Sequence, residues 1–492
     1  MSSIRQLWER DRGAALALVA TSLFLLMGVA AISADLGYYY LSASRIQRAA
    51  DAASLAGVVH LPQQPGTASS TAIEIALLNG YEDGDVASNT TVSPSAISAN
   101  QLEVRISTEV DTFFAKVLGW ETMTIARTAV AEYIPPLRLG SPSNVFGNDP
   151  SCYSTNPDCA GNFWANIHGQ QTDTRMGDAF SSFCADGEGS TDSCDENPAY
   201  RSTGYLYGVV PGASSFTVET LDMAFHNDSG GVQNGNEHRT GDHNEFCSGC
   251  PGPTTKLRVY KPDATPLILE TKNAPVCTAT YAPQAQIDPD DDAPFSDPSW
   301  VWDAACTIDS SSAPDGIWVV QVVLDSEDRK TSGLNRYSIR TNVGNIFGLG
   351  DFSLFSNEDA SVSTFYLAEV LDYYAGKTFV VELYDPGDSN AGGVISLIQP
   401  GGGAFSSCTM ATRDEVGQPW SPRGTISPCQ FTAQNNGGAN DYDGEWVKLE
   451  MTLPATGYVG GWWKVQYDFA GGVEDTTTWR AYMIGNPIHL ID

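Results

Sequence analysis

The run GAALALVATSLFLLMGVAAISA, residues 13–34, decides how the rest of the chain is organised. It contains no charged residue, no Asn, Gln or His, and no proline. At about 1.5 Å per residue, a helix of this length spans roughly 30 Å, the hydrocarbon thickness of a bilayer. The run therefore predicts one transmembrane anchor, and the lipid bilayer is the first expected partner.

The residues on either side of this run predict its orientation. Residues 1–12 form a short leader with Arg5, Arg10 and Arg12, which favours a cytoplasmic N-terminus. All ten cysteines follow the run, as expected if the bulk of the chain lies in an oxidising extracytoplasmic compartment. The alternative is a cleaved signal peptide ending at Ala31-Ile32-Ser33-Ala34, but the apolar run is longer than a signal core and favours a retained anchor.

The charge of the chain restricts its partners. The net charge is −33, and only three of the 26 basic and two of the 59 acidic residues precede Asp35. The exported part is therefore strongly acidic, which keeps it soluble and argues against nucleic acid as a partner.

Residues 35–134 predict a small α+β module. The Ala-rich stretch 36–59 continues the helix beyond the membrane, and alternation of apolar and polar residues at 102–107 indicates a half-buried strand. The other expected elements are a second helix at 69–79, a helical segment at 113–118 and a closing strand at 123–134.

Residues 135–150 are rich in Pro, Gly and Ser and predict a linker. Beyond them, short β-branched and aromatic segments separated by turn residues predict two tandem antiparallel β-sandwich domains, 151–345 and 346–492. The chain is thus expected to be multi-domain and mostly β. The expected strands are 215–221, 256–260, 316–324, 336–341, 352–355, 363–367, 378–384, 394–398, 445–453 and 461–467.

The stretch RDRGAALALVATSLFLLMGVAAISADLGYYYLSASRIQRAADAASLAG, Arg10 to Gly57, resembles the N-terminal region of TadE/TadG-like proteins of the Flp (Tad, tight-adherence) pilus-assembly system. Arg12-Gly13, Asp35-Leu36-Gly37 and the run Gln47 to Gly57 carry the likeness, and parts of the last third are similar to long TadG-like proteins. Pilin-like shaft subunits usually carry Glu where this chain has Leu18. The resemblance therefore implies a stably anchored accessory component.

The implied function is a structural, non-catalytic role in Flp pilus assembly or cell adhesion. Other pilus-assembly or secretion components, and a surface or glycan ligand, are the implied partners. The chain lacks a Gly-x-Ser-x-Gly elbow, a His-Glu-x-x-His motif and a phosphate-binding loop, so no enzyme is predicted. The alternative is a membrane-tethered carbohydrate-binding or hydrolytic extracellular module.

The cysteines pair most simply as sequence neighbours, although sequence alone does not fix their connectivity. The expected disulfides are Cys152–Cys159, Cys184–Cys194, Cys247–Cys250, Cys277–Cys306 and Cys408–Cys429. For the pair Cys247–Cys250 the alternative is a zinc site with His238 and His243 as the other two ligands. The oxidising compartment favours the disulfide.

No cofactor is required by any motif, and calcium is the one candidate ion. Oxygen ligands gather on Gly- and Pro-rich turns, as in extracellular calcium sites, but their composition favours turn residues that bind their own backbone. The candidate ligands are Asp385, Asp388, Asn390, Asp441, Asp443 and Glu445, with a further acidic run at 288–292. Five tryptophans could form a sugar-binding face or belong to the cores of the sandwiches. They are Trp300, Trp302, Trp420, Trp462 and Trp463.

Overall fold

In a computed structural model the chain forms two compact units, Met1–Pro135 with Asn486–Asp492, and Pro136–Gly485. The structure describes residues 3–61, 64–149, 163–185, 194–211, 215–226, 242, 250–263, 265–283, 301–309, 316–325, 330–358, 362–387, 392–434, 437–469, 473–485 and 488–491.

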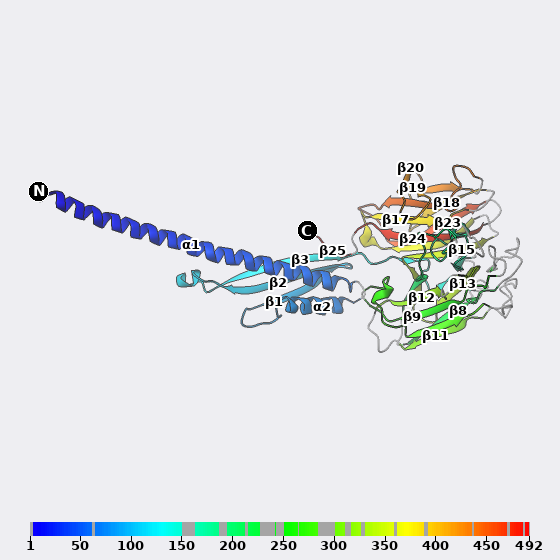
Figure 1. Cartoon of the computed structure of the whole chain (residues 1–492), viewed down its shortest axis with the longest axis horizontal. Coiled ribbons are helices and arrows are strands. Elements are labelled where there is room, and N and C mark those ends of the chain that lie inside the picture. Colours follow the sequence, from blue (N-terminus) through cyan, green and yellow to red (C-terminus); the bar gives the residue numbers. More distant parts are fainter. Residues whose placement is uncertain are drawn as a thin grey trace. The chain divides into compact units, whose positions relative to one another are not determined.

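The first unit is built around one long helix, α1, Ser3–Val58. The predicted membrane run and the predicted Ala-rich stretch are thus a single uninterrupted element (Figure 1). Neither contains a proline, and alanine and leucine have high helix propensity, so nothing in the sequence interrupts the helix at the membrane boundary.

The C-terminal half of α1 packs against α2, Pro65–Leu78, and a sheet of four antiparallel strands in the order β1-β2-β3-β25. The strands are β1 Thr91–Ser98, β2 Gln101–Asp111, β3 Thr122–Tyr133 and β25 Ile488–Ile491. The expected α+β module is therefore present. The predicted helical segment at 113–118 is a short 3-10 turn, η1, Ala115–Leu118.

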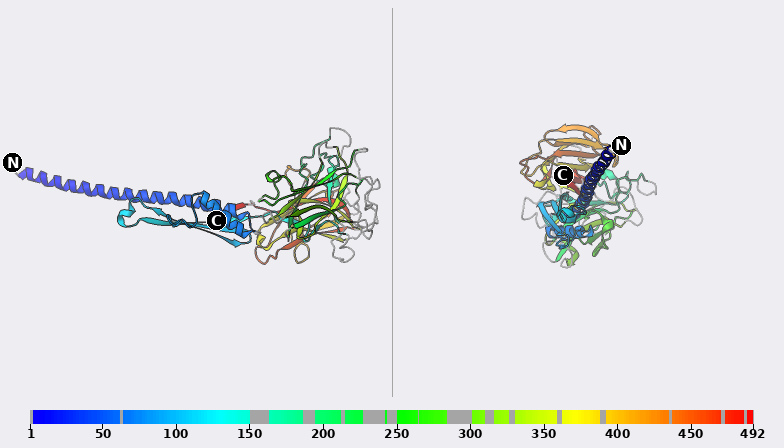
Figure 2. Two further views of the ribbon diagram at one scale, coloured as in Figure 1. Left: turned by 90° about the horizontal axis from the view of Figure 1, so that it is seen from below. Right: turned by 90° about the vertical axis from the view of Figure 1, so that its left-hand side faces the viewer.

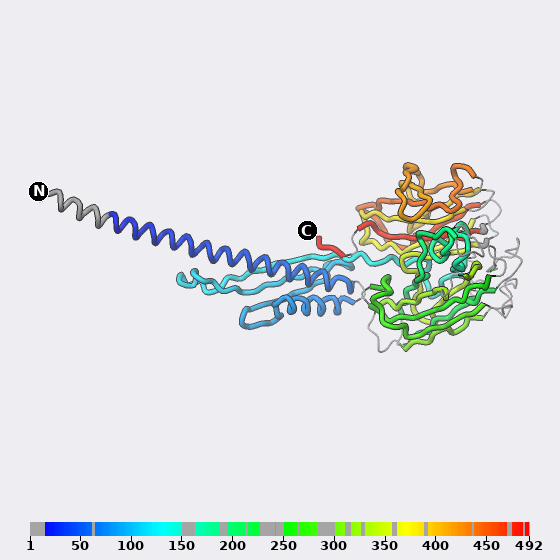
Figure 3. Tube along the Cα trace, viewed as in Figure 1, coloured from blue at the N-terminus to red at the C-terminus, as the bar shows by residue number. Residues whose placement is uncertain are grey.

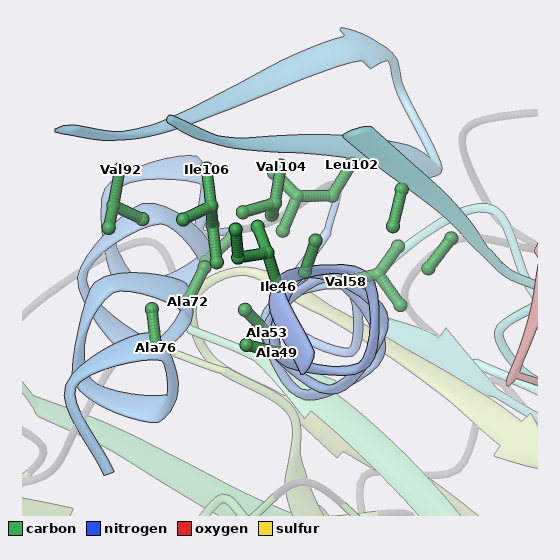
Figure 4. Close-up of a cluster of buried hydrophobic side chains, with 14 of the residues drawn as sticks. Ile46, Ala49, Ala53, Val58, Ala72, Ala76, Val92, Leu102, Val104 and Ile106 are labelled. Atoms are coloured by element: carbon green, nitrogen blue, oxygen red, sulfur yellow. The ribbon is translucent and has the colours of Figure 1, made fainter. Parts of the chain in front are cut away.

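Small side chains let these elements approach closely. Ala49 and Ala53 of α1 and Ala72 of α2 are completely or almost completely buried beneath Leu102 and Ile106 of β2, as Figure 4 shows. A Cβ at Gly57 would lie 2.5 Å from Leu102 and 2.6 Å from the Ala68 carbonyl oxygen. The Ala-rich run ending in glycine is thus what the close packing of α1 requires.

The last strand of the chain belongs to the first unit. β25 pairs with β3, with Leu490 opposite Ala131 and His489 opposite Glu132 (Figure 3). The His489 imidazole lies 3.3 Å from the Glu132 carboxylate. Residues 488–491 were expected in the second sandwich, and this expectation was wrong because strand pairing between distant segments leaves no local sequence signal.

The second unit contains two large antiparallel sheets. One has the order β10-β9-β12-β7-β14-β4-β16-β23-β18-β21, and the other β11-β8-β13-β6-β15-β24-β17-β22-β19-β20 with β5 beside β13. The bounds are β4 Arg138–Leu139, β5 Val145–Phe146, β6 Phe163–His168, β7 Tyr205–Val210, β8 Ser215–Leu221, β9 Thr255–Tyr260, β10 Cys277–Tyr281, β11 Asp303–Asp309, β12 Trp318–Leu324, β13 Leu334–Thr341, β14 Asn345–Leu349, β15 Asp351–Glu358, β16 Val362–Val370, β17 Thr378–Tyr384, β18 Gly393–Ile398, β19 Cys408–Arg413, β20 Ser421–Ile426, β21 Gln430–Ala433, β22 Trp446–Thr452, β23 Gly461–Phe469 and β24 Val473–Met483.

The connectivity of these sheets repeats. Strands β6 to β13 pair as β6-β13-β8-β11 in one sheet and β7-β12-β9-β10 in the other, which is the strand order of an eight-stranded jelly roll. Strands β15 to β18 and β21 to β24 reproduce the same order, as β15-β24-β17-β22 and β16-β23-β18-β21, with β19 and β20 inserted.

Equivalent aromatic pairs fill the space between the sheets of each repeat. Phe216 of β8 packs on Trp318 of β12 with ring centroids 5.4 Å apart, and Phe379 of β17 packs on Trp463 of β23 at 5.1 Å. The Tyr207 and Tyr337 hydroxyls are 2.9 Å apart in the first repeat. At the equivalent position of the second repeat, the Phe365 ring of β16 packs on the Trp479 ring of β24. The repeats are thus alike in packing as well as in topology.

The expected boundary at residue 345 lies at the junction of the two repeats, after β13 and before β15, but the two sheets continue across it. β6 pairs directly with β15, and β14 and β4 join β7 to β16, so both sheets run through both repeats. Residues 136–485 consequently form one compact unit. The predicted linker 135–150 is also corrected in part, because β4 and β5 lie inside these sheets.

Three expected disulfides are confirmed: Cys184–Cys194, Cys277–Cys306 and Cys408–Cys429. Cys277 of β10 and Cys306 of β11 connect the outermost strands of the first repeat across the two sheets. Cys408 of β19 and Cys429, next to β21, make a similar connection in the second repeat. The pair Cys152–Cys159 lies outside the described residues and stays a prediction.

Deleting residues 486–492 is expected to destabilise the first unit selectively. The deletion exposes the β3 edge and removes pairing to four residues, at about 0.5–1.5 kcal/mol per hydrogen bond. The Tyr133 N–H donates to the Asn100 carbonyl on the β2 side, and successive amides of a strand point to opposite neighbours, so Val130 and Glu132 are the amides that face β25. Hydrogen exchange of the Val130 and Glu132 amides should accelerate roughly 10- to 100-fold, while the amides of β17 stay unchanged.

The control is His489→Ala, which removes the contact between the imidazole and the Glu132 carboxylate and keeps the strand. Glu132 retains hydrogen bonds from the Asn100 and Gln101 side-chain amides, so the expected change is less than about 1 kcal/mol. Equal protection of the Val130 and Glu132 amides with and without residues 486–492 would show that β25 contributes nothing to the sheet.

Candidate functional site: the membrane anchor and its junction with the first unit

The first part of the site is the apolar stretch of α1. From Ala15 to Ala34 nearly every side chain is exposed in the isolated chain, and the most apolar window of the helix has a mean hydropathy of 2.4 with none of its residues buried. Phe24, for example, is 76% exposed. A continuous apolar surface of this size requires cover, and its length fits a bilayer.

The anchor ends at a carboxylate that binds a loop from the sheet. The Asp35 Oδ1 atom accepts hydrogen bonds from the Phe113 N–H at 2.8 Å and the Phe114 N–H at 3.2 Å. Its Oδ2 atom accepts from the Phe114 N–H at 3.1 Å and the Ala115 N–H at 2.7 Å. Three consecutive backbone amides of the β2–β3 connection are therefore fixed to the first residue after the membrane run.

The loop has a defined local structure. We call residues 112–121 the tip loop. The Thr112 N–H donates to the Glu121 carbonyl and the Thr112 hydroxyl donates to the Trp120 carbonyl, which closes its base. Gly119 has φ +90, which favours glycine, and lets the chain turn into β3 after η1.

These contacts set the charge state of Asp35. Burial of the Asp35 carboxyl raises its pKa, but the N–H groups of Phe113, Ala115 and Phe114, with the nearby Lys116 ammonium, outweigh this effect and lower the pKa below its ordinary value of 3.8. Asp35 is therefore ionised at neutral pH, and its interaction with the tip loop is lost only on acidification through that lowered pKa.

The candidate calcium ligands are only partly placed. Asp385 lies against the 441–445 turn, where its Oδ1 accepts the Gly444 N–H at 2.7 Å. Asp441 accepts the N–H groups of Gly437 and Asp443 within its own turn. Burial raises the pKa of Asp443, an effect that the Arg175 guanidinium opposes.

Within the residues that the structure describes, no three His, Cys, Asp or Glu side chains form a group suited to a metal. Asp388, Asn390 and the run 288–292 lie outside those residues, so calcium stays a prediction. Asp441 behaves as a turn residue that binds its own backbone, whereas Asp385 binds the 441–445 turn and the Glu445 carboxylate lies 3.9 Å from the Arg423 guanidinium.

Of the zinc alternative, only Cys250 is described. It is disulfide-bonded, which removes it as a thiolate ligand and agrees with the preference for a disulfide. His238, His243 and Cys247 lie outside the described residues.

The described tryptophans of the proposed sugar-binding face lie apart. Trp463 is completely buried in the core, and Trp462 on the same strand packs on Tyr366. Trp302 stacks with Arg340 beside β11, and Trp420 stacks with Arg413 beside β20, at the opposite end of that sheet. These residues do not form one face, and Trp300 is not among the described residues.

Sequence reasoning missed a row of charges across the strands β15, β24, β17 and β19. Arg201 and Arg480 both bind the Asp351 carboxylate, at 2.8 and 3.8 Å, while Arg480 and Arg413 both bind Glu382. The two carboxylates are almost fully buried. The row connects strands of the second repeat, so we assign it a structural role.

One N-terminal apolar helix among the described residues, together with extracellular-type disulfides, fits a single-pass membrane protein. Comparison with known families assigns that helix: residues 13–60 match the family described as Putative Flp pilus-assembly TadE/G-like. The N-terminal segment of this chain is thus TadE/G-like, as its sequence indicated.

Other comparisons add no assignment. No curated protein matches the chain. Among solved structures, one entitled "Structure of infectious bursal disease virus Gt strain" aligns with 12% identity over 58% of this chain and 81% of that chain. The TM-score of this alignment is 0.07.

Replacing Asp35 with Ala is expected to release the tip loop. The amides of Phe113, Phe114 and Ala115 lose their acceptor, so their hydrogen exchange should rise at least about 10-fold at neutral pH. Asp35→Asn should give an intermediate effect, because an amide keeps one oxygen acceptor but not the charge.

Asp111→Asn is the matched control, because Asp111 is an exposed carboxylate at the end of β2. In the unchanged chain, protection of the three amides, corrected for intrinsic exchange, should be constant above about pH 4 and fall as the pH is lowered further. Protection that is independent of Asp35 would contradict the assigned contact.

Proposed function

We propose that this protein is a membrane-anchored, non-catalytic structural component of Flp/Tad-type pilus assembly or of surface adhesion. The observation that carries the proposal is the coincidence of the TadE/G-like match with α1. Residues 13–60 include the exposed apolar stretch and also the small residues that pack α1 against the sheet. The matched segment is thus the membrane anchor and part of the core of the first unit at once.

The orientation that we propose places the leader in the cytoplasm and both units outside. The arginines of the leader favour this arrangement. The three described disulfides, all in the second unit, support it because such bonds persist in oxidising compartments.

The partners that we propose are the bilayer and other components of a pilus-assembly or secretion machine. The double jelly roll is the exported part that the anchor carries. Jelly rolls serve many unrelated functions, so the fold by itself names no ligand. The carbohydrate-binding or hydrolytic alternative gains no support from the described tryptophans, which are dispersed.

The test is purification of the tagged full chain from its native membrane after mild crosslinking. A matched chain has residues 1–34 replaced by an unrelated apolar helix with the same flanking charges, so that both units remain anchored. Pilus-assembly components are expected with the natural chain and at least several-fold less with the replaced one.

Removing the whole protein is then expected to change pilus number or attachment. If no pilus or secretion component is recovered with the natural chain, and removal leaves both pilus number and attachment unchanged, the proposed function is wrong.

A further inference from the structure

The tip loop carries an unusual group of exposed apolar side chains. Val117, Leu118 and Trp120 are 83%, 73% and 68% exposed, and Phe113 and Phe114 are about half exposed. They follow one another within a single short connection, so they form a contiguous patch. A patch of this kind on a folded unit indicates a surface that is covered in use.

The position of this patch along α1 is fixed by Asp35. Its carboxylate holds the amides of residues 113–115 at 2.7–3.2 Å, and the Phe113 ring packs on Tyr38 with centroids 4.9 Å apart. Figure 2 shows the β2–β3 hairpin running beside α1 and ending partway along it, with the remaining N-terminal helix standing alone.

The level of the tip loop follows from helix geometry. Residues 15–34 span about 30 Å as a helix and fill the hydrocarbon core of a bilayer. Asp35 then lies at the edge of that core, and the tip loop bound to it lies at the same level. Exposed Leu36 and Tyr40 of α1 continue the apolar surface there.

The composition of the loop suits the boundary between lipid and water. Tryptophan and other aromatic residues concentrate in this region because they combine an apolar ring with a polar group or edge. Lys116 is exposed in the middle of the loop, where an ammonium can reach lipid phosphates while its alkyl chain stays among apolar groups.

We propose that the tip loop is a second membrane contact, in which Phe113, Phe114, Val117, Leu118 and Trp120 enter the outer interface of the bilayer beside the anchor. Because α1 is part of the core of the first unit, the helix and the unit tilt together relative to the bilayer. Two contacts, one spanning and one at the surface, restrict this tilt. The proposal depends on the membrane anchor and not on the pilus role.

The test uses the full chain reconstituted in liposomes of phosphatidylcholine with a minor fraction of phosphatidylglycerol. Leu118→Cys is labelled with an environment-sensitive fluorophore, since the described cysteines include no free thiol. Ile97→Cys is the matched control, because Ile97 is 52% exposed at the other end of the same sheet, roughly 35 Å away along β2.

The label at residue 118 is expected to emit at shorter wavelength than the label at residue 97. It should also be quenched several-fold more strongly by phospholipids with a nitroxide near the top of the acyl chain. Val117→Cys provides a second labelling site and should behave like residue 118.

Equal emission and equal quenching at residues 118 and 97 would overturn the proposal. A second result would also overturn it: a label at residue 118 that is shielded from water, is not quenched by the nitroxide lipids, and shows energy transfer between labelled chains. In that case a second copy of the chain would cover the loop. Failure of the chain to partition into the liposomes at all would overturn both the anchor and the second contact.

Discussion

The structure depends on one constraint. An apolar helical surface about 30 Å long, whose exposure to water is energetically unfavourable, is continuous with the core of a folded unit. Here α1 is uninterrupted from Ser3 to Val58, and its second half supplies part of the core of the first unit. Anchoring and folding therefore share one element.

This continuity explains the composition of the helix on both sides of Asp35. The membrane half has large apolar side chains, which suit lipid, whereas the packed half has alanines and Gly57, which let α2 and the sheet approach. Asp35 marks the change, because an ionised carboxylate is costly within the hydrocarbon core and is stabilised at its edge by three amides. The second unit is inserted between β3 and β25, so both ends of the inserted segment return to the anchored unit.

Local patterns in the sequence predicted the local structure well. The strands 215–221 and 378–384 match β8 and β17 residue for residue, and the anchor, the Ala-rich helix and three disulfides are present as expected. Nonlocal features were missed for a physical reason. The pairing of β6 with β15, the return of β25 to β3 and the binding of residues 113–115 by Asp35 join segments far apart in the chain, and neither periodicity nor composition records such contacts.

The central claim is that residues 13–34 stay in the mature chain as its anchor. The most direct measurement is alkaline extraction of native membranes, followed by N-terminal sequencing of the recovered protein. The account predicts a chain that remains in the membrane fraction with the residues before Ala34 intact. A soluble chain beginning just after Ala34 would contradict it, because the apolar run would then be a removed signal peptide and Asp35 would end no membrane helix.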